Sequence, residues 1–256
     1  MDYKVRHKNK KSAFSLIELS IIVVIIAIIV ASISQGSKLI ESTKIKSVIS
    51  EVQTILHANN TFQLTYKKLA GDMNNAYDFF GPQNCGGGSG SGTKWACNGS
   101  GNNLLSADGS GGYYREEHIF WEHLYYSGIM THTAPVGNGT TVYISNNIKG
   151  LNISAQDIAA FNEINGLRLG KQRADKMATN PEQTYNNQGK TFTPLQAYQI
   201  DKKLDDGVAD TGSVLGINGY DDASVISTVC KSGSEYDLLQ DTAECYIHIE
   251  LELLYD

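Results

Sequence analysis

The sequence contains one acidic group whose residue types suit a hard cation. Four aspartates lie close together near the C-terminal end of the chain, at Asp201, Asp205, Asp206 and Asp210. Calcium takes several carboxylate and carbonyl oxygens, so these residues form a candidate calcium site, although their spacing is not that of an EF-hand loop. Solvated acids at a helix end and in the following turn explain the same residues. Both interpretations stay open at this point.

A second group of ionisable side chains lies in the middle of the chain. A helix would bring His118, Glu122 and His123 close to one another. The zinc-protease spacing is absent and no third ligand is indicated, so surface or interface histidines are the better interpretation. The sequence also lacks a phosphate-binding loop, a nucleophile elbow and a dinucleotide fingerprint. We therefore expect no enzymatic function, and no cofactor other than the candidate calcium ion.

The chain begins with a basic stretch followed by an apolar segment. Residues 1–13 hold five basic residues against one acid, a net charge of +4, whereas the other 243 residues hold 16 against 26, a net charge of −10. Residues 14–33 carry Glu18 as their only formal charge, and a helix of this length crosses a bilayer core of about 30 Å. Because basic residues mark the cytoplasmic side, the acidic main part is expected to face outward. Its charge argues against nucleic acid as a partner.

A long helix is expected to start in this apolar segment. Residues 14–68 contain no proline, and Gly36 is their only glycine, so nothing forces the helix to end at the lipid boundary. Beyond the membrane, apolar residues recur at spacings of three and four, at Ile45, Val48, Ile49, Val52, Ile55, Leu56 and Phe62. This period predicts an amphipathic helix that packs one face against the outer domain.

The outer part of the chain shows both helical and strand patterns. Short helices are expected at residues 115–126, 154–161 and 194–205. In the last of these, Thr193 can cap the helix, Pro194 suits its first position and Gln196 completes a capping box. Residues 245–253 alternate between apolar and polar and predict a half-buried strand. Further strands are expected at residues 140–145 and 223–230 from their β-branched content.

All four cysteines lie in the outer part, at Cys85, Cys97, Cys230 and Cys245. An even number in an oxidising compartment predicts two disulfides rather than a metal site. Three pairings are possible. Proximity in the sequence favours Cys85 with Cys97, around a Gly-rich loop, and Cys230 with Cys245.

The order of the N-terminal residues distinguishes two kinds of leader. In an ordinary secretory signal the small residues follow the apolar region and the segment is removed. Here Ser12 and Ala13 precede it, so a cut beside Ala13 leaves the apolar helix on the mature protein. A cut near Ala31 or Ser34, as in an ordinary signal, is the alternative.

Residues 11–19, Lys-Ser-Ala-Phe-Ser-Leu-Ile-Glu-Leu, resemble the cleavage and methylation signature of type IV prepilins and type II secretion pseudopilins. The resemblance implies that a membrane aspartyl peptidase, the prepilin peptidase, cuts between Ala13 and Phe14. The same enzyme methylates the new amino group of Phe14. The family usually has Gly before the cut, where this chain has Ala13, the smallest substitute.

Glu18, the fifth residue after this cut, is expected to serve subunit assembly. A carboxylate inside lipid costs several kcal/mol unless it finds a partner, and a filament offers the amino group of a neighbouring Phe14. The alternative interpretation is a tolerated charge near the cytoplasmic interface.

More loosely, residues 70–76, 80–81, 120–124 and 200–207 resemble a subgroup of pilin-like proteins. Some major pseudopilins bind calcium in their C-terminal loops, which adds to the case for the aspartate site. The resemblance implies an α+β, pilin-like fold, with a long N-terminal helix packed on a small antiparallel sheet. The expected divisions are a leader at 1–13, a transmembrane half-helix at 14–34, an amphipathic half-helix at 35–69 and a periplasmic α+β domain at 70–256.

The function that the resemblance implies is structural: a minor subunit of a type IV pilus or a type II secretion pseudopilus. Its expected partners are the prepilin peptidase, other pilin or pseudopilin subunits, the inner-membrane assembly platform and membrane lipid. The expected location is the bacterial inner membrane, crossed once, with the N-terminus cytoplasmic and the main domain periplasmic. Two other classes remain: a membrane-anchored periplasmic binding or adhesion protein that never polymerises, and a secreted enzyme released by ordinary signal cleavage.

Overall fold

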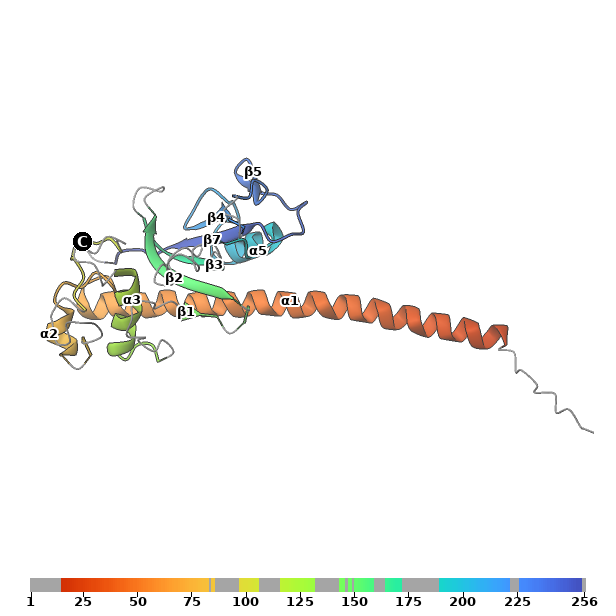
Figure 1. Cartoon of the computed structure of the whole chain (residues 1–256), viewed down its shortest axis with the longest axis horizontal. Helices are drawn as coiled ribbons and strands as arrows, with labels where there is room; N and C mark the ends of the chain where they lie inside the picture. Colours follow the sequence, from red (N-terminus) through yellow and green to blue (C-terminus); the bar gives the residue numbers. More distant parts are fainter. Residues whose placement is uncertain are drawn as a thin grey trace, which may run out of the picture. The chain divides into compact units, whose positions relative to one another are not determined.

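The computed structural model describes residues 15–82, 84–85, 97–105, 116–131, 143–145, 147–148, 150–158, 164–171, 189–221 and 226–254. By their internal contacts the residues fall into two units, 1–43 and 44–256. Helix α1, Leu16–Tyr66, begins in the first unit and ends in the second, and Figure 1 shows it as one continuous helix. The prediction of a single long helix is therefore confirmed.

In the first unit, α1 exposes its apolar side chains. Leucine, isoleucine and valine residues from Leu16 to Ile33 are each at least 45% exposed. The helix is long and apolar enough to cross a membrane, and the span that meets this criterion buries nothing inside the protein. Apolar surface of this extent needs lipid or other helices around it.

In the second unit, α1 buries one face in the main core. Six of the seven residues predicted for this face are buried: Ile45, Val48, Ile49, Val52, Ile55 and Phe62. The seventh, Leu56, is partly buried and packs against the same cluster. The amphipathic half of the helix is thus confirmed, and its period of three and four matches the side that the domain covers.

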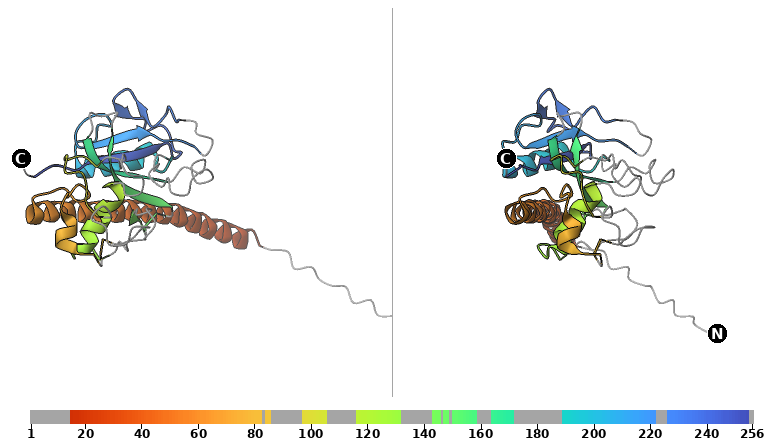
Figure 2. Two further views of the ribbon diagram at one scale, coloured as in Figure 1. Left: turned by 60° about the vertical axis from the view of Figure 1, so that its left-hand side comes forward. Right: turned by 90° about the vertical axis from the view of Figure 1, so that its left-hand side faces the viewer.

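The sheet of the second unit has five antiparallel strands in the order β1-β2-β3-β7-β4. They are β1 Tyr143–Ile144, β2 Leu151–Ile158, β3 Ile164–Lys171, β4 Val214–Asn218 and β7 Cys245–Glu250. A separate hairpin joins β5, Lys231–Ser232, to β6, Glu235–Tyr236. In Figures 1 and 2 the sheet lies along the part of α1 that belongs to this unit. The fold is α+β and pilin-like, as predicted.

The described part of the second unit contains three further helices: α2 Ala76–Phe80, α3 Glu116–Tyr126 and α5 Pro194–Leu204. The capping box of α5 is present, because the Thr193 side chain accepts from Gln196 N–H and the Gln196 side chain accepts from Thr193 N–H. The predicted helices at 115–126 and 194–205 are confirmed, within the residues that the structure describes.

The predicted helix at residues 154–161 is wrong, because its described residues form strand β2. Ser154 resembles a helix cap locally, but Leu151, Ile153 and Ala155 alternate into the core. Every residue of β2 also has a partner on β3. Long-range pairing and burial therefore override the local capping pattern.

Two strand predictions hold in part. β1 lies inside the predicted range 140–145, and β7 lies inside 245–253. However, β7 is buried on both faces rather than half-buried, since Tyr246 and His248 are buried as well. A Cβ on Gly166 of β3 would collide with the His248 ring, which explains a glycine within that strand.

The predicted strand at 223–230 is not a strand in its described residues, 226–230. There, Ile226 forms only an isolated bridge with Tyr220. Residues 222–225 lie outside the described part of the chain.

Candidate functional site

The start of α1 is built around Glu18. The Ser15 N–H donates a hydrogen bond to Glu18 Oε2 at 2.8 Å, so the carboxylate lies over the first turn of the helix. A carboxylate is favoured there because free N–H groups and the helix dipole make this end electropositive. The predicted cut between Ala13 and Phe14, with the methylated Phe14, lies outside the described residues.

The two described serines between Glu18 and Ile33 satisfy their hydroxyl groups within the helix. Ser20 Oγ donates to Ile17 O and Ser32 Oγ donates to Ile28 O, each at 2.8 Å. Hydroxyls bonded in this way can enter lipid without an unpaired donor. Glu18 is the only residue of this segment with a formal charge, and it would be the one charge to enter a membrane with it.

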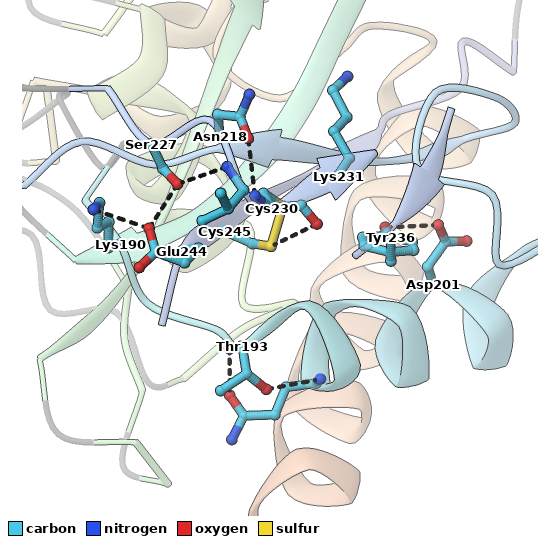
Figure 3. The surroundings of a disulfide bond; sticks show 12 residues. Lys190, Thr193, Asp201, Asn218, Ser227, Cys230, Lys231, Tyr236, Glu244 and Cys245 are labelled. Carbon is cyan, nitrogen blue, oxygen red and sulfur yellow. Dashed lines mark hydrogen bonds and ion pairs between the residues drawn. A yellow bond between two sulfur atoms is a disulfide. The ribbon is translucent and has the colours of Figure 1, made fainter. Parts of the chain in front are cut away.

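Both predicted cysteine pairs are bonded in the structure. Cys85 and Cys97 form one disulfide, with an S–S distance of 2.01 Å, and Cys230 and Cys245 form the other at 2.06 Å. Figure 3 shows the second bond joining the first residue of β7 to the residue before β5. The Cys230 N–H also donates to Asn218 Oδ1 at 3.1 Å. The disulfide thereby ties the β5–β6 hairpin to β7, and the Asn218 bond ties it to the edge strand β4.

The aspartates proposed for calcium are brought together only in part. Asp201, Asp205 and Asp206 each place one carboxylate oxygen within 4.8 Å of the others. Asp210 is not in this group and pairs with Lys231 instead. Of the three, Asp201 is buried, whereas Asp205 and Asp206 are exposed.

Hydrogen bonds within the chain already use these carboxylates. Asp201 accepts from Gly207 N–H at 2.9 Å and from the Tyr236 hydroxyl at 2.8 Å, the latter shown in Figure 3. Asp205 accepts from the Ser213 N–H, and Asp206 accepts from Val208 N–H and the Thr211 hydroxyl. These bonds shape residues 205–213 into a loop.

Burial and hydrogen bonding act in opposite directions on the pKa values of this group. Burial raises the pKa of Asp201 to about 6, against the lowering effect of its bonds to Tyr236 and Gly207. The bonds from Thr211 and Val208 lower the pKa of Asp206. At neutral pH the group carries negative charge, which is chemically compatible with a cation.

In the group of His118, Glu122 and His123, the last residue has a structural role. His123 is fully buried, rather than at a surface or an interface as expected from the sequence. Its Nδ1 accepts from Gly71 N–H at 2.9 Å, and its Nε2 lies 2.7 Å from Cys97 O, to which it donates. Because both nitrogens are engaged, His123 is unsuited to bind a metal. Its ring also stacks on Phe62 of α1, with centroids 5.7 Å apart.

Asp72 is an important residue that sequence reasoning did not identify. It is fully buried, and its Oδ1 accepts from Gly101 N–H, Asn102 N–H and the Ser100 hydroxyl at 2.6–3.1 Å. Its Oδ2 accepts from Asn103 N–H at 2.7 Å. One carboxylate thus holds residues 100–103 in place. The only sequence signal was its position in the loosely pilin-like stretch at 70–76.

The comparisons with known proteins bear on the N-terminus alone. The family model described as the prokaryotic N-terminal methylation motif matches residues 8–34. No curated protein and no solved structure matches the chain. The match covers the end of the basic stretch from residue 8, the predicted cut, Glu18 and most of the exposed apolar part of α1. At residues 8–34 the chain therefore carries the prepilin-type signature of the type IV pilin and pseudopilin family.

Proposed function

We propose that this chain is a structural subunit of a type IV pilus or a type II secretion pseudopilus. Prepilin peptidase cuts it between Ala13 and Phe14 and methylates Phe14. The mature chain waits in the inner membrane and then enters a filament through α1. No substrate turnover by the chain itself is part of this role.

The proposal rests on the difference between two successive stretches of α1. One stretch exposes apolar side chains along the segment that carries the methylation motif, and the next stretch packs one face into the core. An ordinary anchor needs only the first stretch. A helix that is docked in its own domain and also has an apolar extension can pack against the helices of neighbouring subunits through van der Waals contacts.

Glu18 supports assembly over simple anchoring. A carboxylate in the apolar stretch opposes membrane residence unless a cation neutralises it. The cut creates a cation at the amino group of Phe14, close to the helix start where Glu18 already binds Ser15 N–H. In a filament, Glu18 of one subunit pairs with the Phe14 amino group of the next.

The same proposal fixes location and partners. The basic leader stays in the cytoplasm, α1 crosses the inner membrane once, and the body with its two disulfides lies in the oxidising periplasm. The partners are the prepilin peptidase, the assembly platform, membrane lipid and other subunits. The bulk of the outer domain favours a minor subunit present in few copies.

Filament shearing tests this function against the two other classes. The full chain is expressed in a host with a complete pilus or pseudopilus apparatus, and in the same host without the assembly platform. We expect the chain in the sheared filament fraction only when the platform is present. A chain that stays in the membrane fraction in both strains is a tether, and a soluble chain starting after residue 31 is a secreted protein; either result overturns the proposal.

A further inference from the structure

A tight turn at residues 237–240 presents two leucines to solvent. Gln240 N–H donates to Asp237 O at 3.1 Å, and Leu239 N–H donates to Asp237 Oδ1 at 3.2 Å. Leu238 is 51% exposed and Leu239 is 94% exposed. Aspartate is usual at the first position of such a turn, but Gly, Asn, Asp or Ser are usual at its centre. The two leucines therefore serve neither the turn nor the core.

The turn is held firmly at its base. Asp237 N–H donates to Cys230 O at 3.1 Å, and Cys230 is bonded to Cys245 at the start of β7. The preceding residue, Tyr236, is buried and donates to Asp201 at 2.8 Å, as Figure 3 shows. The leucines are thus fixed in an exposed position, and fixed contact groups lose little conformational freedom on binding.

Acidic residues flank the two leucines in the sequence. Glu235, Asp237 and Asp241 lie within residues 235–241, and no basic residue does. This charge disfavours an anionic lipid surface. It suits an apolar surface with basic residues at its edge, because complementary charge steers and orients association.

Helix α1 of this same chain offers such a surface just beyond the membrane segment. Leu39 and Ile40 are 69% and 59% exposed. Lys44 is one turn after Ile40, and Lys46 is two turns after Leu39. Each lysine therefore lies on the same side of the helix as its apolar partner. Both lysines are exposed. Glu41 is the only acid between residues 38 and 46, against three lysines.

We propose that the turn at 237–240 of one copy packs on the Leu39–Ile40 face of α1 in a second copy of this chain. Leu238 and Leu239 cover the apolar pair, and Asp241 and Glu235 lie opposite Lys44 and Lys46. The contact rests on the proposed function, because it forms between subunits held side by side by their helices. It forms only where two copies of this chain are neighbours in one filament.

Photo-crosslinking in assembled filaments tests the contact. A benzophenone amino acid replaces Leu239 in the full chain, and in a control it replaces Leu195 of α5, another solvent-exposed leucine, which is 48% exposed. Illumination of sheared filaments is expected to give a dimer for the Leu239 probe alone, with the second copy labelled within residues 36–47. Labelling of only lipid or another protein, or a dimer labelled elsewhere, overturns the inference.

Charge exchange gives a second test that does not depend on the probe. Lys44→Glu and Asp241→Lys are each expected to lower the yield of the Leu239 crosslink at least threefold, and the double variant is expected to restore it. Two single losses without restoration contradict the pairing. If the chain reaches filaments without a crosslink, this inference fails alone. If it never reaches filaments, the proposed function fails and the inference fails with it.

Discussion

The Ser15 N–H donates to the Glu18 carboxylate across the first turn of α1, at 2.8 Å. The single charge of the apolar segment is therefore oriented toward the end of the helix that prepilin cleavage would free. Because the helix start and the new amino group are both positive, they attract the same carboxylate. In the proposed filament, this bond would hold Glu18 at the helix start, where the amino group of a neighbouring Phe14 is expected.

Replacing this carboxylate should separate membrane insertion from assembly. Glu18→Gln removes a charge that opposes insertion, so the amount in the membrane is expected to stay the same or rise. Loss of the charge pair should lower incorporation into filaments about tenfold or more, since leaving one partner of a buried pair alone costs about 3–5 kcal/mol. The readout is the amount of the chain in the filament fraction divided by its amount in the membrane fraction. Ser20→Ala is the matched control, because its hydroxyl bonds only within the helix; equal ratios for both variants would contradict the role of Glu18.

His123 should make the domain sensitive to acid. Burial lowers its pKa to about 4, below the ordinary value, so the folded state favours the neutral ring. Its contribution to the free energy of unfolding is present above about pH 6.5 and is lost as the pH falls toward 4, by about 3 kcal/mol. Protonation of Nδ1 would also remove the acceptor for Gly71 N–H.

The measurement is denaturant unfolding of the full chain in detergent between pH 4 and pH 7, for the wild type and for His123→Gln. The variant is expected to be less stable at pH 7 and to lose less stability on acidification. A parallel pH profile for both proteins would show that His123 does not titrate in this way.

Asp201 should affect the pH dependence of stability in the opposite direction to His123. Its folded pKa is raised to about 6 by burial, so the folded state favours the protonated acid. The contribution of Asp201 to stability is present below its ordinary pKa of about 4 and is lost as the pH rises through about 6. Asp201→Asn is expected to remove this part of the pH profile, measured as above. A pH profile that Asp201→Asn leaves the same as that of the wild type would contradict this sign.

Loss of the Asp72 carboxylate should destabilise the outer domain. Asp72→Ala leaves the N–H groups of Gly101, Asn102 and Asn103 without their acceptor. We expect a loss of about 3 kcal/mol in the free energy of unfolding, together with faster hydrogen exchange at residues 100–103. A loss below about 1 kcal/mol would mean that water replaces the carboxylate.

Calcium binding is best tested on stability. The hydrogen bonds to Asp205 and Asp206 already hold residues 205–213, so chelation is expected to leave the unfolding temperature unchanged. A rise on adding calcium, abolished by Asp205→Asn, would establish a calcium site and contradict this expectation.

The elements that the sequence predicted best are those with local causes. The buried face of α1 follows from its apolar period, and α5 follows from the capping box at Thr193 and Gln196. By contrast, β3 contains Gly166 and Gly170 and has little strand character of its own. Its place between β2 and β7 depends on pairing across the fold.

The same distinction applies to the functional residues. Residues 8–34 are recognisable because the motif is a short continuous pattern. The role of His123 is not, since its partners Gly71 and Cys97 are 52 and 26 residues away in the chain. Asp210 likewise resembled a member of the acidic group by spacing, but its ion pair with Lys231 depends on the β5–β6 hairpin. Such contacts appear only once the chain is folded.

Processing at the N-terminus tests the central claim most directly. The measurement is the intact mass and N-terminal residue of the chain isolated from native envelopes, with and without the prepilin peptidase. We predict a methylated Phe14 start that disappears when the peptidase is absent. A chain that starts at Met1 in both strains, or beyond residue 30, would contradict the account.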